Sequence, residues 1–192
     1  MIRVILGSIV AAIAMFVLSF IFFATPLYRA AVGNLDDGQA ASVQQALAVS
    51  LPGTGTYHVP LPTTAQQTVM YGQGPVATIH YNIGGFSSSD PAVILGGLVL
   101  ALLAALLMAT ALIGIDRRVP DFGTRARVVV LLCVASAAFM TLGHPIMFHS
   151  GWGYFIYTFI ADAITLSAGG LIIARWFLPT QRTAPADAPT DV

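Results

Sequence analysis

The chain has 192 residues, of which 57% are hydrophobic and only 8% are charged, and its mean hydropathy is +0.83. A soluble domain carries about 25% charged residues, so this composition excludes an ordinary soluble domain. The basic and acidic residues balance to a net charge of zero, so no broad basic surface invites nucleic acid. The single cysteine, Cys133, excludes an internal disulfide and a cysteine-rich zinc site.

Four separate apolar runs approach the length of about 20 residues that a helix needs to cross a bilayer. They occupy residues 4–24, 91–115, 128–148 and 154–177. The pattern predicts an all-α integral membrane protein with a four-helix transmembrane bundle. A cleaved signal peptide is the alternative interpretation of residues 1–24. Because this first run exceeds the usual signal core of about 7–15 residues, and Phe22–Ala24 lacks small residues at both cleavage positions, we expect an uncleaved helix.

Residues 25–90 form the one long polar stretch, which lies between the first and second runs. Its first half predicts a helix that starts near Asp36 and presents Ala40, Val43, Leu47 and Leu51 on one face. Two aspartates near the start favour the positive end of the helix dipole.

The second half of the polar stretch shows β-type patterns. Thr56–Leu61 is expected to be extended, with prolines that argue against a central strand. Residues 68–71 and 76–83 are separated by Gly72–Pro75, which predicts a hairpin. We therefore expect a small extracytoplasmic α+β cap that is too small to be stable without packing on the helices or on a partner.

Small residues recur every fourth position in the second run, at Gly97, Ala101, Ala105 and Ala109. Such a ridge lets helix backbones approach closely, which usually means packing and sometimes oligomerisation. The sequence therefore predicts a helix-packing ridge on this span.

The arginines fall almost entirely on one side of the predicted spans. They are Arg117, Arg118, Arg125 and Arg127 in the link 116–127, Arg3 before the first run, and Arg175 and Arg182 at or after the end of the last. By the positive-inside rule, both termini and this link are cytoplasmic, while the cap and the turn 149–153 face outward. We expect a multi-pass protein of the bacterial inner (cytoplasmic) membrane. Residues 178–192 predict a disordered cytoplasmic tail.

Asp162 lies eight residues inside the last run, where a carboxylate is expensive and needs a reason. Thr158 and Thr165 share its helical face, and counting from a turn centred near Gly151 places Thr141 or Met140 level with it. One interpretation is a polar anchor that joins helices through hydrogen bonds to these threonines. The other is the proton or cation site of a small transporter or channel. We prefer the anchor, because polar groups commonly join membrane helices.

The four histidines are expected on the outer side: His58 and His80 in the cap, His144 and His149 at the end of the third run. If the cap folds over the bundle, they could converge on a metal or sense acidification. Only His144 and His149 are closely spaced, and interfacial histidines are commoner than ligands, so we predict no metal site. The chain has no lysine and therefore no phosphate-binding loop, and we expect no cofactor.

The segments Gly55–Pro60 and Gly74–Tyr81, followed by Gly84-Gly85, resemble a pattern of uncharacterised bacterial four-span inner-membrane proteins. Trp152-Gly153-Tyr154 and Asp162 match the same pattern in the last span. The resemblance covers most of the chain and implies one span, an extracytoplasmic segment and then three spans. His144-Pro145 and His149 depart from the pattern. No function follows from the resemblance.

The leading hypothesis is a non-catalytic accessory or scaffolding subunit that is embedded in the lipid bilayer and packs against other membrane proteins or a second copy. The sequence shows no paired catalytic groups and no cofactor motif. A small proton- or cation-coupled transporter or channel that uses Asp162 is the first alternative. An outward-facing metal- or pH-responsive module that uses the histidines is the second.

Overall fold

The structure, a computed structural model, describes residues 2–87, 89–116, 118–119 and 121–178. It consists of two compact units. The helical unit is built from the chain before residue 34 and after residue 90, and the cap segment is Asn34–Asp90. The predicted cytoplasmic tail lies outside the described residues, apart from Leu178.

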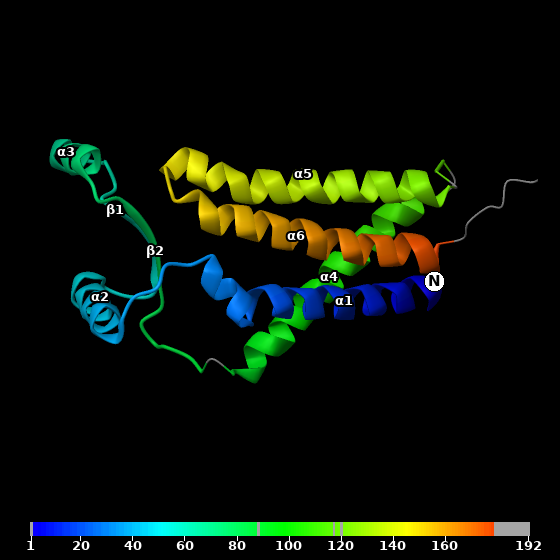
Figure 1. Cartoon of the computed structure of the whole chain (residues 1–192), viewed down its shortest axis with the longest axis horizontal. Coiled ribbons are helices and arrows are strands. Elements are labelled where there is room, and N and C mark those ends of the chain that lie inside the picture. The colour runs from blue at the N-terminus through cyan, green and yellow to red at the C-terminus, as the bar shows by residue number, and fades with distance from the viewer. Residues whose placement is uncertain (1, 88, 117, 120, 179–192) are drawn as a thin grey trace, which may run out of the picture. The chain divides into compact units, whose positions relative to one another are not determined.

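The helical unit contains four long helices (Figure 1). They are α1 (Ile2–Phe23), α4 (Pro91–Ile115), α5 (Phe122–Phe148) and α6 (Trp152–Ile172), and α6 continues as the π-helical turn η2 (Ile173–Phe177). Within the described residues, these four are the helices long and apolar enough to cross a membrane. The structure thus confirms the predicted set of four apolar helices, the pattern of a multi-pass membrane protein.

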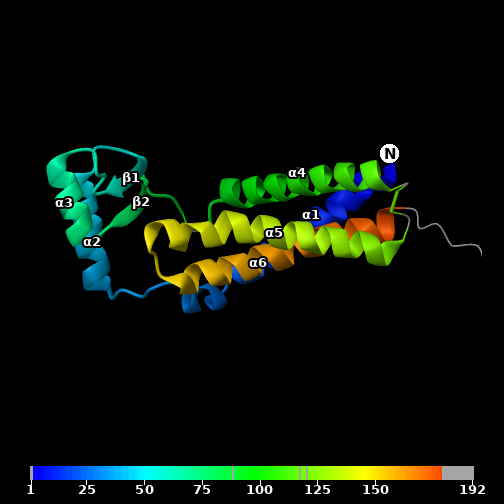
Figure 2. The same cartoon turned by 90° about the horizontal axis from the view of Figure 1, so that it is seen from above.

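The helices do not form a symmetrical bundle. Helix α1 packs on α4 and α6, and α5 packs mainly on α6. Figure 1 shows α4 crossing the other helices obliquely, and Figures 1 and 2 both show that it lies closer to α6 at its C-terminal end than at its N-terminal end. The core therefore lies where α1, α4 and the end of α6 meet. Its fully buried members include Ala11, Ala105 and Ala174.

Helix α5 starts at Phe122, earlier than the predicted Val128. Asp121 is the reason, because its carboxylate accepts a hydrogen bond from the backbone N–H of Thr124 at 2.7 Å and caps the helix. This backbone bond, with a second bond from the Thr124 hydroxyl, lowers the pKa of Asp121. The capped start draws Arg125 and Arg127 out of the predicted link and into the helix.

Arg125 is buried at the end of the helical unit near the α4–α5 connection. Its side chain is only 1% exposed, forms an ion pair with Asp116 and donates from Nε to the carbonyl of Val119 at 2.6 Å. Nearby, the guanidinium of Arg175 lies 5.4 Å from the centre of the Phe122 ring, a cation–π contact between the end of α6 and the start of α5. These contacts hold the α4–α5 connection against the helices.

Aromatic side chains tie α1 to α6 at the opposite end. The hydroxyl of Tyr157 donates to the carbonyl of Phe22 at 2.5 Å. Tyr28, in the short 3-10 helix η1 (Pro26–Ala30), packs edge to face against Tyr154 and Tyr157. Burial raises the pKa of Tyr28, and the neighbouring hydroxyl of Tyr154 raises it further.

The cap segment contains α2 (Asp37–Ser50), β1 (Gly55–Val59), α3 (Ala65–Gln73) and β2 (Ala77–Tyr81). Helix α2 starts with a capping box. The carboxylate of Asp36 accepts from the N–H of Gln39 at 2.8 Å, and the Gln39 side chain accepts from the N–H of Asp36 at 3.1 Å. The helix that the sequence predicts here is confirmed.

The predicted hairpin between residues 68–71 and 76–83 is wrong. Residues 65–73 form α3, because the Thr64 hydroxyl accepts a hydrogen bond from the N–H of Gln67 at 3.2 Å and caps a helix. Strand β2 pairs antiparallel with β1 instead, with Gly55 opposite Tyr81. The short apolar run Val69–Tyr71 fits a helix as well as a strand, so its pattern could not separate the two.

Candidate partner-binding site

The cap segment has no hydrophobic core. None of its residues that the structure describes, 34–87, 89 and 90, is buried. Several of its large apolar side chains are exposed to solvent: Leu35 is 59% exposed, Val43 49% and Ile83 63%. A domain of this size is marginal even with a core. Side-chain hydrogen bonds cap the starts of its helices, but none of its described residues is fully buried to hold the elements together.

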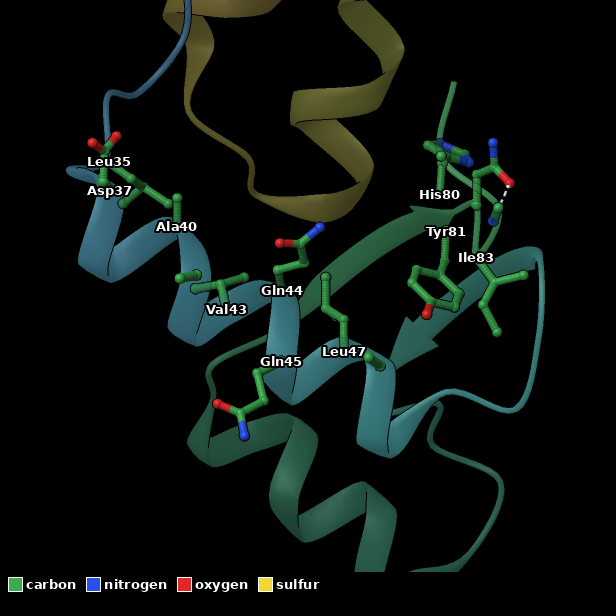
Figure 3. A pocket seen from close by; sticks show the side chains of 15 residues that line it. Leu35, Asp37, Ala40, Val43, Gln44, Gln45, Leu47, His80, Tyr81 and Ile83 are labelled. Carbon is green, nitrogen blue, oxygen red and sulfur yellow. Dashed lines mark hydrogen bonds between the residues drawn. The ribbon is translucent and has the colours of Figure 1, made fainter. Parts of the chain in front are cut away.

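A wide groove of about 1190 Å³ runs between α2 and the end of β2 (Figure 3). One wall carries side chains of α2, among them Val43 and Leu47, and the other carries Tyr81 and Ile83. The helical periodicity of the sequence found the α2 wall. The β2 wall was not predicted from the sequence, because residues 76–83 were expected to pair with residues 68–71 instead of with β1.

The chemistry of the groove suits a protein surface better than a reaction. Asp37 is the one charged side chain that lines it, and the other polar side chains are amides, His80 and the hydroxyl-bearing Tyr81. No nucleophile with an adjacent base and no pair of carboxylates lines the groove. The cap segment carries three aspartates and neither lysine nor arginine. The groove therefore offers apolar contacts, neutral hydrogen-bonding groups and a weakly acidic rim.

The two cap histidines lie on one face of the β1–β2 ribbon, and each is bonded to the threonine directly opposite. Nδ1 of His58 lies 3.1 Å from the hydroxyl of Thr78, and Nδ1 of His80 lies 3.0 Å from the hydroxyl of Thr56. The strand register produces both pairs. This arrangement gives each histidine a structural partner and a fixed ring orientation.

The histidines of the helical unit have different surroundings. The ring of His144 stacks on Phe155 of α6, with centroids 4.8 Å apart and planes 17° apart, and also packs on Phe148. His149 ends α5 in the left-handed conformation, with φ of 51°. Among the described residues, no group of three or more histidines, cysteines or acids is placed to hold a metal ion.

Asp162 is half-buried on α6, and no hydrogen bond joins it to another residue in the part of the chain that the structure describes. Of the neighbouring threonines, Thr141 donates to the carbonyl of Ala137 at 2.7 Å, and Thr158 donates to that of Tyr154 at 3.0 Å. Both hydroxyls thus form hydrogen bonds within their own helices and not with Asp162.

Thr165 lies one turn from Asp162 and is 6% exposed. Its hydroxyl has no hydrogen-bond partner among the described residues. The polar face that the sequence predicts on α6 therefore contains two groups without an internal partner, the Asp162 carboxyl and the Thr165 hydroxyl.

The register of α5 against α6 differs from the one that the sequence predicts. The side chain of Cys133 lies next to that of Ser167, and His144 stacks on Phe155. These two contacts place Asp162 level with Ala137 or Ala138 rather than with Met140 or Thr141. The difference arises because α6 already starts at Trp152, so the centre of the turn lies before Gly151.

The small-residue ridge of α4 is used inside the chain. Ala101 is 9% exposed, while Ala105 and Ala109 are fully buried in the cluster that also contains Ala11 and Met15 of α1. Gly97, one turn earlier, faces the ring of Phe16. This ridge therefore packs α4 on α1 and is not open to another protein.

Comparisons of the chain with protein families, with curated proteins and with solved structures find no match.

Proposed function

We propose that this protein is a non-catalytic accessory or scaffolding subunit of the bacterial inner membrane, and that its cap segment binds another protein. The observation that carries the proposal is a capped, folded segment without a single buried residue among those described, which leaves an apolar groove open. The four spans have their own core, so the cap segment is the part of the chain that needs a partner.

The exposed apolar side chains that line the groove support this role. Complete burial of a Val, Leu or Ile side chain contributes about 1.5–3 kcal/mol. Covering the exposed side chains of Val43 and Ile83, and the part of Leu47 that is still exposed, would therefore supply a few kcal/mol to the cap segment. A partner protein that covers the groove stabilises the cap segment and is bound by the same contacts.

The topology follows from the charge distribution. The positive-inside rule places both termini and the α4–α5 connection in the cytoplasm and the cap segment outside. The partner would then be another membrane protein with an extracytoplasmic part, or an extracytoplasmic protein. The lipid bilayer surrounds the spans in either case.

The histidines add no support for a metal- or pH-responsive module. His58 and His80 are hydrogen bonded to threonines, and His144 stacks on Phe155 and packs against Phe148. Each has a structural role that accounts for its position.

Replacing Val43 by arginine tests the groove. Val43 lines the groove, and Val49 on the same helix does not, since it is 83% exposed on another face. Because a charge in an apolar contact is costly, we expect Val43→Arg to reduce partner recovery at least about tenfold. The measurement is the amount of partner that remains bound to the full-length chain after extraction from its native membrane in mild detergent.

Val49→Arg is the matched control and should retain the partner, with both variants showing the thermal unfolding of the wild-type spans. Equal recovery from the Val43 and Val49 variants would show that the groove does not bind the partner.

A further inference from the structure

We propose that the face of α6 that carries Asp162 binds a transmembrane helix of a partner protein, and that this helix carries a lysine or arginine at the same depth. The inference rests on the proposed accessory role and adds a second contact, inside the membrane, with defined chemistry.

The first step is depth. The apolar segment from Trp152 to Phe177 has 26 residues. At 1.5 Å per residue, Asp162 lies about 15 Å along a segment of about 39 Å. This is near the middle of a hydrocarbon core of about 30 Å. A carboxylate at that depth is costly without a partner, and the described residues offer it no hydrogen bond.

The second step is direction. Ile156, Ile160 and Ile164 form one exposed stripe of α6, each 45–47% exposed, as expected for a face in contact with lipid. Asp162 lies about 200° around the helix from Ile160 and Ile164. It therefore points away from the lipid-facing stripe, toward the side on which helices pack.

The third step is the incomplete cover on that side. Met108 of α4 reaches α6 at Gly169 and Gly170. Toward the Asp162 end, α4 diverges from α6 and follows α1 instead (Figures 1 and 2). Asp162 consequently remains only partly buried, on a side that the chain's own helices leave partly uncovered.

Charge complementarity identifies the occupant. In the described spans, every arginine lies near an end: Arg3 in α1, Arg125 and Arg127 in α5, and Arg175 in η2. Helix α4 has no charged residue. A second copy would bring another Asp162 to this depth and no cation. A different helix with one cation at its midpoint would pair with the carboxylate and satisfy both groups.

The test uses a probe helix of known sequence. The purified full-length chain is placed in lipid nanodiscs with a labelled helix of about 22 leucines and alanines that has one arginine at its midpoint. The matched probe carries leucine in place of arginine. We expect energy transfer to show binding of the arginine probe by the wild type and by Asp162→Glu. Asp162→Asn should bind it about tenfold more weakly.

Three results would overturn the inference. They are equal binding of the arginine and leucine probes by the wild type, unchanged binding by Asp162→Asn, and self-association of the wild type that Asp162→Asn loses. The comparison of the two probes needs no variant, so it holds even if Asp162→Asn unfolds. Val43→Arg should bind the arginine probe as the wild type does. A failure here therefore differs from a failure of the cap groove.

Discussion

Replacing Arg125 by alanine is expected to lower the free energy of unfolding by about 3 kcal/mol. The guanidinium is almost fully buried, pairs with Asp116 and holds the carbonyl of Val119. Its removal leaves the Asp116 carboxylate without its cation and frees the α4–α5 connection. We place the effect at the low end for a buried pair because the side chain of Asp116 is still 22% exposed. Unfolding in mixed micelles of mild detergent and SDS measures it.

Arg127→Ala is the matched control, since Arg127 lies in the same turn of α5 but is exposed. It removes the same charge from the same side of the membrane and should change the free energy of unfolding by less than about 0.5 kcal/mol. If both variants unfold alike, Arg125 acts through the charge balance of the connection and not through its buried contacts.

Replacing Gly170 by alanine should destabilise the packing of α6 on α5 by about 1–3 kcal/mol. A Cβ at Gly170 would overlap Cγ1 of Val129. Val129 is only 6% exposed, and its β-branched side chain is stiff, so it cannot easily move aside. The helices must separate to admit the methyl group. The melting temperature of the detergent-solubilised chain is the measurement.

Gly143→Ala, in α5, provides the comparison, because no atom lies within 4 Å of the position of a Cβ there. Alanine is the better helix former by about 0.5–1 kcal/mol, so this variant should match or slightly exceed the wild-type melting temperature. An equal loss of stability in both variants would contradict close packing at Gly170.

The four long helices were predictable because a run of apolar residues long enough to cross a bilayer almost always forms a helix. The start of α5 was less predictable. Its first turns contain Arg125 and Arg127, which lower the hydropathy, and the Asp121 cap that starts the helix acts through a single side-chain bond. The role of Arg125 was not predictable, since its burial depends on the fold of the α4–α5 connection.

In the cap segment, the local structure was predictable in part and the strand pairing was not. The α2 helix was predictable from the aspartates near its start and from its apolar period. The pairing of β2 with β1 was not, because it joins strands on either side of α3 and a short apolar run carries no information on its partner. The β2 wall of the groove follows from that pairing.

For Asp162, the sequence predicted the helical face but not its neighbour. The inward face follows from the spacing of Thr158 and Thr165. The level of α5 opposite it depends on the length of the turn after His149, and a shift of two or three residues moves Thr141 out of reach. The absence of an internal hydrogen bond to Asp162 among the described residues favours a contact with another helix over the predicted internal anchor.

The two proposed contacts and the internal packing divide the chain into parts with different roles. Alanines of α1 and α4 pack the spans against each other. The cap groove and the Asp162 face retain groups that this packing does not satisfy. An accessory subunit of this kind would hold its partner once outside the membrane and once within it.

A photoreactive residue introduced at position 43 in intact cells tests the central claim, that another protein covers the cap groove, most directly. The account expects one crosslinked product of defined mass from position 43, and none from position 49 on the exposed face of α2. A chain that crosslinks equally at both positions, or that yields no protein adduct at position 43, would contradict it.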